Sequence, residues 1–281
     1  MQPLSFSFFR VVAVAAAIVP VLSALSVDVL RSVDAIPAHI AGRFQASPTI
    51  ALFLDFDGTL VPLQPRPEDV WLDDATRRAL SRLARSPRFR VWIVTGRRRA
   101  DVRARVRVPG LRYLGLHGWE GRAATPITED SREAVACAKS WLASLTLGVP
   151  GVWLEDKGLT LAVHYQSVTE EGVRRARKFV QGVLEPFADT LQLIRGKKVW
   201  ELAPRELGDK GLAVSSELSA MGSQTIPIYI GDDRMDEPAF AALHCGITVR
   251  VGRACRTQAR YRLSSVEQVQ EFLQILEREF A

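Results

Sequence analysis

"LFLDFDGTL", residues 52–60, places two aspartates one residue apart at the end of an apolar run. The run is typical of a buried parallel strand, and Gly58 lets the chain turn away from it. Two carboxylates at one strand end, Asp55 and Asp57, repel each other unless a cation lies between them. Taken alone, an acidic strand end is more often a loop or a helix cap. The rest of the chain decides between these interpretations.

From residue 50 onward, short β-branched apolar runs alternate with amphipathic stretches. This alternation is typical of a doubly wound α/β domain with a parallel sheet. Three runs are expected as buried parallel strands, namely 49–56, 89–96 and 226–233. Each ends in small or acidic residues. Because ligands gather beyond the carboxyl ends of such strands, the three ends predict one convergent site.

The pattern changes between the second and third of these strands. The elements expected there, in chain order, are a helix over 131–145, a hairpin over 152–166, a helix over 169–187 and a hairpin over 191–204 that turns at Gly196. They form an α+β module, at about residues 122–205, inserted into a Rossmann-like core of residues 28–121 and 206–281. A last helix is expected behind a Ser264 to Glu267 capping box.

Composition excludes several classes of protein. With 281 residues, 47% hydrophobic and 24% charged, the chain is neither disordered nor fibrous. The net charge of +6 comes largely from arginines in 97–107. We expect these arginines on the solvent-exposed face of a helix whose other face buries Val102 and Val106. No aromatic residue interleaves them, so nucleic acid is not an expected partner. Three widely spaced cysteines argue against disulfides and zinc and favour a reducing compartment.

The first 27 residues differ from the rest. Residues 11–22 are continuously apolar behind Arg10, as in the core of a signal peptide, but Pro20 interrupts them and they are short for a membrane span. Three interpretations stay open: a leader or anchor, an extra core helix, or translated sequence upstream of the true start. We place residues 1–27 outside the fold and expect a cytoplasmic protein without stable membrane association, with export or anchoring as the alternative.

Polar motifs follow the other two strands. "GDDRMDE" at 231–237 offers Asp232 and Asp233 as further ligands for Mg²⁺, a hard ion that prefers oxygen. "VTGR" at 94–97 adds a hydroxyl at a third strand end, and Lys210 begins a helix. Because two acidic clusters follow two predicted strands, it is a poor explanation that each is only a loop or a helix cap. The set contains a nucleophile, an acid, a phosphate clamp and metal ligands.

"DFDGTL", "TGR", Lys210 and "GDDRMDE", in this order, resemble the four motifs of the haloacid dehalogenase superfamily of aspartyl-phosphate phosphatases. The resemblance implies that Asp55 is the nucleophile and takes the phosphoryl group. It implies that Asp57 protonates the leaving oxygen and then activates water. Thr95 would donate to the phosphate and Lys210 would balance its charge. The residues implied around Mg²⁺ are Asp55, Asp57, Asp232 and Asp233, with Asp233 or Asp236 acting through water.

The inserted module corresponds in position to the cap of sugar-phosphate members. "LHGWE" (116–120), "LEDKGLTLAVHY" (154–165), "GKKVWELAP" (196–204) and "GDDRMDEPAF" (231–240) resemble the trehalose-6-phosphate phosphatase family. The resemblance implies that Glu155, Lys157 and Glu201 on the cap bind sugar hydroxyls. On the core side, the residues implied to border the sugar phosphate are Asp55, Phe56, Asp57, Gly58, Arg97, His117 and Gly118. His164 is expected to be a sheet histidine. Gln166 stands where many members have arginine, which leaves that position without an ionic contact.

The function implied is magnesium-dependent hydrolysis of trehalose 6-phosphate through an aspartyl-phosphate, with functional coupling to a trehalose-6-phosphate synthase as a further expectation. The nearer alternative is a capped phosphatase for another substrate, such as sucrose 6-phosphate or a glycosyl-3-phosphoglycerate. The remoter one is a non-enzymatic domain that binds or regulates sugar phosphates. That domain would lack the nucleophile or the acid, whereas Asp55 and Asp57 are both present.

Overall fold

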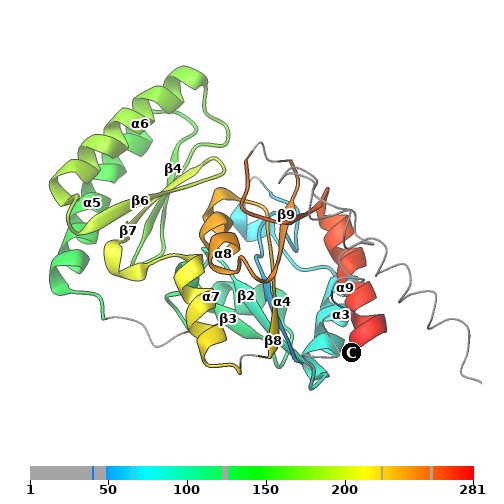
Figure 1. Ribbon diagram of the computed structural model, residues 1–281. Coiled ribbons are helices and arrows are strands. Elements are labelled where there is room, and N and C mark those ends of the chain that lie inside the picture. The colour runs from blue at the N-terminus through cyan, green and yellow to red at the C-terminus, as the bar shows by residue number, and fades with distance from the viewer. Residues whose placement is uncertain (1–39, 41–48, 65, 122–125, 223, 254–255) are drawn as a thin grey trace, which may run out of the picture.

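The computed structural model describes residues 40, 49–64, 66–121, 126–222, 224–253 and 256–281. The expectation for residues 1–27 therefore lies outside the described residues. Two groups of elements lie side by side (Figure 1). The first contains β1 (Thr49–Leu54), η1 (Pro67–Asp69), α3 (Asp74–Arg85), β2 (Phe89–Val94), α4 (Arg99–Val106), β3 (Arg112–Leu114), η2 (Leu116–Gly118), α7 (Lys210–Ser219), β8 (Thr225–Gly231), η5 (Arg234–Asp236), α8 (Glu237–Ala242), β9 (Ile247–Val251), β10 (Tyr261–Leu263) and α9 (Val266–Phe280).

The first group, the core, is built on a six-stranded sheet in the order β10-β9-β8-β1-β2-β3. All neighbouring strands in it are parallel. Alternate residues of β1 point to opposite faces: Leu52 and Leu54 pack with α3, α4 and α9, whereas Ala51 and Phe53 pack with α7 and α8. Helices on both faces of a parallel sheet confirm the predicted doubly wound class. The three predicted strands are β1, β2 and β8, with β1 between the other two.

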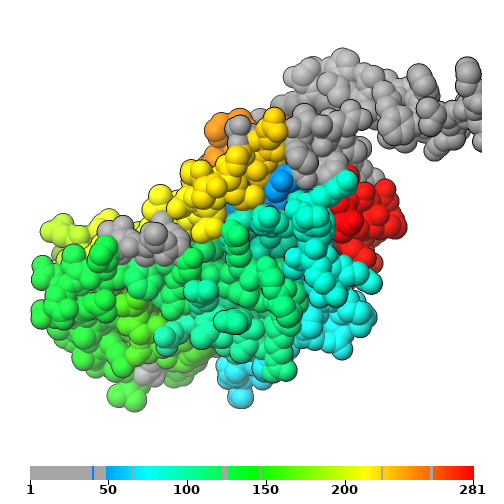
Figure 2. Space-filling model, turned by 90° about the horizontal axis from the view of Figure 1, so that it is seen from below, coloured from blue at the N-terminus to red at the C-terminus, as the bar shows by residue number. Residues whose placement is uncertain are grey.

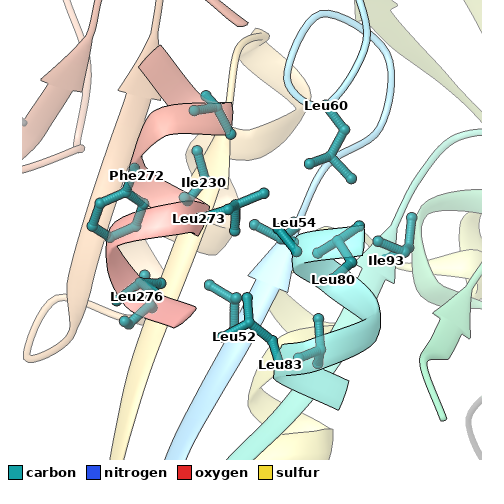
Figure 3. Close-up of a cluster of buried hydrophobic side chains, with 14 of the residues drawn as sticks. Leu52, Leu54, Leu60, Leu80, Leu83, Ile93, Ile230, Phe272, Leu273 and Leu276 are labelled. Carbon is teal, nitrogen blue, oxygen red and sulfur yellow. The ribbon is translucent and has the colours of Figure 1, made fainter. Parts of the chain in front are cut away.

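One face of this sheet carries the larger apolar cluster, shown in Figure 3. Leu80 and Leu83 of α3 and Leu273 and Leu276 of α9 are buried against β1, so two helices far apart in sequence lie together. Figure 2 shows this neighbourhood from below, with the red α9 against the cyan α3 region. Each such side chain contributes about 1.5–3 kcal/mol on burial, which holds α3 and α9 against the sheet at β1.

The second group, the cap, contains α5 (Glu129–Gly148), β4 (Trp153–Asp156), β5 (Leu161–His164), α6 (Glu170–Leu184), η3 (Glu185–Phe187), β6 (Leu191–Gly196), β7 (Val199–Pro204) and η4 (Arg205–Leu207). Its antiparallel sheet has the order β4-β5-β7-β6. The helix, hairpin, helix, hairpin order agrees with the prediction, although β6 includes Gly196 and the turn lies at Lys197 and Lys198. The domain boundaries at residues 122 and 205 stay a prediction.

The two faces of the cap sheet differ. Leu161, Val163 and Leu202 pack with α5 and α6 in an apolar cluster. The opposite face carries Glu155, Ala162 and Glu201, which are neighbours across three strands. Because side chains alternate along a strand, one face of the cap is fixed to its helices and the other is left for the core.

Two local expectations need correction. The last helix begins at Val266 with Ser265 as its N-cap, and the Ser264 backbone N–H donates to Gln268 Oε1 at 2.7 Å, so the predicted capping box is wrong. In the arginine-rich stretch, Val102 and Val106 are buried as predicted, but Arg105 is also buried. In the part of the chain that the structure describes, no helix has both the length and the apolarity to cross a membrane.

Candidate active site

The carboxyl ends of β1, β2 and β8 meet at one edge of the core sheet, as predicted for adjacent parallel strands. Asp55 follows β1, Thr95 follows β2 and Asp232 follows β8. A cavity of about 150 Å³ lies between this edge and the polar face of the cap. The residues that line it include Asp55, Asp57, Gln64, Val70, Thr95, Arg97, His117, Glu155, Lys157, His164, Gln166, Lys197, Glu201, Lys210, Asp232 and Asp233.

Three buried carboxylates and one lysine lie together at the floor of this cavity, which Asp55, Asp232 and Lys210 line, whereas Asp236 is fully buried and is not part of the lining. Lys210 Nζ donates to Asp55 Oδ1 at 2.8 Å and to Asp236 Oδ1 at 2.7 Å. Lys210 reaches this position because it begins α7, which Asp209 caps by accepting from the Leu212 N–H. One carboxylate oxygen from each of Asp55, Asp232 and Asp236 lies within 4.8 Å of the others. We call these three aspartates and Lys210 the core cluster.

The core cluster carries more negative than positive charge. Burial raises the pKa of Asp55 well above its usual value, Lys210 opposes this, and Asp236 and Asp232 raise the pKa further. Burial, then Asp236 and Asp233, raises the pKa of Asp232 to about 7. Burial alone would lower the pKa of Lys210, but Asp236 and Asp55 outweigh it and raise that pKa. A further cation would relieve the excess negative charge.

The core cluster fits a magnesium ion by its chemistry. Its free ligand atoms are carboxylate oxygens, which Mg²⁺ prefers. Gly58 has φ of +82°, and a Cβ there would lie 2.3 Å from Asp232 Oδ2, so glycine lets the loop after β1 approach the acidic strand end. Mg²⁺ held here would depend on Asp55 and Asp232, with Asp236 beside them.

Two residues expected around the metal have other partners. Asp233 accepts from the backbone N–H of Lys197 at 2.8 Å and of Arg234 at 2.6 Å, which ties the cap hairpin to η5. The carboxylate of Asp57 is held by Arg97, whose Nε and Nη2 each donate to it at 2.7 Å. Asp236 lies close to Asp55 and Asp232, but its own oxygens accept from Lys210, from the Tyr229 hydroxyl and from the Asp233 backbone N–H.

The remaining core residues lie beside this group. Thr95 is buried, and its hydroxyl accepts from the Arg97 backbone N–H at 3.1 Å. The Phe56 ring lies 5.6 Å from Cζ of Arg97. Gly118 has φ of +104°, and a Cβ there would lie 2.1 Å from Cβ of Ala213, so this glycine permits η2 to pack on α7.

Glu201 joins the cap to the core. It is 2% exposed, and it accepts hydrogen bonds from Lys157 Nζ at 3.2 Å and from the Thr160 hydroxyl. His117 Nε2 lies 3.0 Å from Glu201 Oε2 and comes from η2 of the core, where it has φ of +58°. Lys157 Nζ also donates to the Gly96 carbonyl at 3.0 Å. These contacts hold the cap against the core over the cavity.

The electrostatics of the cap are opposite to those of the core cluster. Burial alone would raise the pKa of Glu201, but Lys157 and His117 outweigh it and lower that pKa well below its usual value. Burial would also raise the pKa of Glu155, but His164 and Lys157 lower it. We call Glu155, Lys157, His164, Glu201 and His117 the cap cluster. It holds its carboxylates ionised without any added ion.

His164 is a site residue that the sequence analysis did not select. Its Nε2 lies 2.9 Å from Glu155 Oε2, and its ring stacks on Trp153 with centroids 3.8 Å apart. The alternation of side chains along β5 could have indicated this residue. Ala162 pairs with Glu155 and Glu201, and His164, two residues further along the strand, lies on the same face of the cap sheet. Lys197 also lines the cavity, and so does Gln166.

The sequence profile of the trehalose-phosphatase family matches residues 53–267, which include both strand-end clusters and the whole cap. The chain belongs to this family. A Zea mays trehalose 6-phosphate phosphatase is 34% identical over 253 residues, which cover 81% of this chain and 69% of the relative. The trehalose-phosphate phosphatase B of Arabidopsis thaliana is 32% identical over 249 residues, covering 81% and 66%. The chain thus spans about two thirds of these relatives.

Solved structures show the same fold. The Candida albicans trehalose-6-phosphate phosphatase C-terminal domain has a TM-score of 0.73 at 20% identity and covers 85% of this chain and 96% of its own. The sucrose-phosphatase from Synechocystis has a TM-score of 0.50 at 18% identity, covering 82% and 97%. Each likeness covers more than four fifths of this chain, so it extends over both the core and the cap.

Proposed function

We propose that this chain hydrolyses trehalose 6-phosphate to trehalose and phosphate. The observation that carries the proposal is the shared cavity: a carboxylate cluster with a lysine forms its floor, and charged cap side chains form its roof. The floor suits phosphoryl transfer, whereas the roof suits a polyhydroxyl leaving group. The names of the relatives support this substrate.

In the first half of the reaction, an oxygen of Asp55 attacks phosphorus and forms an acyl phosphate. The bond from phosphorus to the 6-oxygen of the sugar breaks, and Asp57 gives its proton to that oxygen. In the second half, Asp57 takes a proton from water, which attacks phosphorus and releases phosphate and the Asp55 carboxylate. The net change is one water consumed for one ester bond broken.

The surrounding groups hold charge in place during these steps. Lys210 donates to Asp55 and stays protonated between Asp55 and Asp236. The Thr95 hydroxyl lies at the neighbouring strand end, where it can donate to a phosphoryl oxygen. A Mg²⁺ ion bound at Asp55 and Asp232 would neutralise phosphoryl charge and keep Asp55 ionised.

The cap cluster would recognise the sugar. Glu155 keeps one third of its side chain exposed and lines the cavity, so it can accept from hydroxyls while His164 holds it. Lys157 and Glu201 fix each other, so their free hydrogen-bonding positions stay oriented. Hydrogen bonds to charged groups contribute about 1.5–3 kcal/mol each, which can distinguish a disaccharide from a smaller phosphate ester.

The proposal is tested by phosphate release from purified protein with Mg²⁺, offered trehalose 6-phosphate, sucrose 6-phosphate and glucose 6-phosphate. We expect trehalose 6-phosphate to have the largest kcat/KM. Preference for sucrose 6-phosphate would instead support the alternative of another capped sugar phosphatase. Release from none of these would contradict the proposal. A cytoplasmic location and coupling to a trehalose-6-phosphate synthase remain part of this proposal, and co-purification with a synthase would support the latter.

A further inference from the structure

Four side chains of alternating charge form a row that ends at Asp57. Arg105 Nε donates to the two oxygens of Asp101 at 2.8 and 2.9 Å. Arg97 Nη1 donates to Asp101 at 2.9 Å, and the other two guanidinium nitrogens, Nε and Nη2, each donate to Asp57. Asp101 and Arg105 are four residues apart on one face of α4, and Arg97 precedes the first residue of that helix by two positions. We call these four residues the charge row.

The far end of the charge row supports a wall of the cavity. Arg105 Nη1 donates to the carbonyls of Glu68 at 3.0 Å and Val70 at 2.7 Å. Val70 lines the cavity, and the Trp71 ring lies 5.2 Å from Cζ of Arg105. The arginine that anchors Asp101 therefore also fixes the segment that contains Val70, which lines the same cavity as Asp57.

Asp101 is the middle of this arrangement. The side chains of Arg97 and Arg105 are 10% and 11% exposed. Burial alone would raise the pKa of Asp101, but hydrogen bonds from Arg105 and Arg97 outweigh it and lower that pKa. Without a negative charge at position 101, two largely buried guanidinium groups would face each other, and Arg97 would lose the contact opposite Asp57.

We propose that Asp101 and Arg105 are positioning residues for the reaction, because they hold Arg97 in the orientation that fixes both oxygens of Asp57. Asp101 does this through Arg97, and Arg105 does it by anchoring Asp101 to the cavity wall. The inference rests on the proposed phosphatase function, in which Asp57 transfers a proton to the leaving oxygen. It assigns a role to two residues that lie outside the four motifs.

A misplaced Asp57 has an effect that depends on the leaving group. A sugar alkoxide or a phenolate needs a proton as it leaves, whereas 4-nitrophenolate leaves without one. A merely structural role for Asp101 would slow all phosphate esters alike. The comparison of trehalose 6-phosphate, phenyl phosphate and 4-nitrophenyl phosphate therefore separates positioning from folding.

The test uses Asp101→Asn, which keeps the shape and removes the charge, Asp101→Glu as the conservative variant, and Glu170→Gln as a control. Glu170 forms an exposed pair with Arg174 at the same spacing of four residues. We expect Asp101→Asn to lose about tenfold to a hundredfold in kcat/KM on trehalose 6-phosphate and phenyl phosphate, but less than about threefold on 4-nitrophenyl phosphate. We compare kcat/KM because it covers only the steps up to departure of the leaving group, and leaves out the second half of the reaction, in which Asp57 activates water for every substrate alike. Asp101→Glu should recover part of the loss, and the control should match the parent.

A second readout does not depend on activity. In the parent, the Arg97 Nε–H bonded to Asp57 should exchange slowly with water by nuclear magnetic resonance, and in Asp101→Asn it should exchange quickly. Unchanged protection, or equal losses on both aryl phosphates, would overturn the positioning role. The parent protein could fail to hydrolyse trehalose 6-phosphate while Asp101→Asn still slows phenyl phosphate more than 4-nitrophenyl phosphate and still speeds exchange of the Arg97 Nε–H. In that case the substrate proposal fails and the positioning role stands.

Discussion

The core cluster and the cap cluster both bury carboxylates in one cavity, but their charges are balanced in opposite ways. At the core, Asp55, Asp232 and Asp236 share Lys210, and burial raises the pKa of Asp55 and Asp232. At the cap, Lys157 and His117 outweigh burial and lower the pKa of Glu201. The core is short of positive charge and the cap is not.

This difference separates the two tasks of the proposed enzyme. A cluster with excess negative charge binds a cation and, with it, a phosphoryl group. A cluster whose charges satisfy each other is already oriented and can recognise hydroxyls without a metal ion. Variants in the core should therefore affect every substrate, and variants in the cap should affect the sugar.

The largest expected effect follows from Asp55→Asn. The amide keeps the shape but cannot attack phosphorus, so turnover of all phosphate esters should fall by about 10⁴-fold or more. The fold should survive, because the substitution removes one of the excess negative charges. Phosphate release and circular dichroism check this together, and activity well above background in protein free of deamidated chains would remove Asp55 from its role.

Removal of metal is the next largest effect. A chelator should abolish turnover and Mg²⁺ should restore it, because Asp55 and Asp232 then regain their counter-charge. Ca²⁺ should substitute poorly, since its larger and looser shell misplaces the nucleophile and the phosphate. Full activity after exhaustive chelation would show that Lys210 alone balances the core cluster.

Substitutions in the cap should have smaller and selective effects. Glu155→Ala and Lys157→Ala remove hydrogen bonds to the sugar, so kcat/KM for trehalose 6-phosphate should fall about tenfold to a hundredfold. Glu201→Gln tests the same cluster while keeping the shape of a buried side chain. Hydrolysis of 4-nitrophenyl phosphate, which does not reach the cap, serves as the control. Equal losses on both substrates would indicate a folding defect instead of lost recognition.

The smallest effect concerns stability and pH. In metal-free protein, the pKa of Asp232 is about 7 when folded and about 3.9 when unfolded, so the folded state binds the extra proton. The stability that Asp232 contributes should therefore fall as pH rises from about 4 to 7 and change little above that range. Glu201 acts oppositely: its lowered pKa gives stability that is present above about pH 4.3 and is lost in acid.

Thermal unfolding midpoints measured across this pH range check the prediction. Asp232→Asn should reduce the slope between pH 4 and 7, and Mg²⁺ should raise the midpoint of the parent at neutral pH. A slope that is the same in Asp232→Asn and the parent would show that Asp232 does not carry the excess charge.

The sequence predicts the central strands and the strand-end residues well, because both depend on local pattern. The apolar run before Asp55 forms β1, which ends at Leu54, and Gly58 makes the turn beyond it with a positive φ. The trehalose-phosphatase resemblance then selects Glu155, Lys157 and Glu201, which the structure brings to one cavity. Local signals and motif order were sufficient for this part.

Contacts between segments that are far apart in the sequence could not be predicted from local pattern. Arg97 and Asp57 are 40 positions apart, and nothing in either motif indicates that they pair through two hydrogen bonds. His164 was indicated by alternation along β5, but a lone histidine in a strand is more often structural. The capping box failed because Ser264 and Ser265 are both good N-caps, and the chain uses the second.

The most direct test of the account is to find where the phosphoryl group resides during turnover. Protein mixed with trehalose 6-phosphate and Mg²⁺ is quenched on the millisecond scale and reduced with borohydride, which converts an aspartyl phosphate to homoserine. Mass spectrometry of the peptides should then find homoserine at position 55. No homoserine should be found there when a chelator is present, or when the protein is mixed with trehalose instead of trehalose 6-phosphate. Phosphate release without homoserine at position 55, or with homoserine at another carboxylate, would contradict the account.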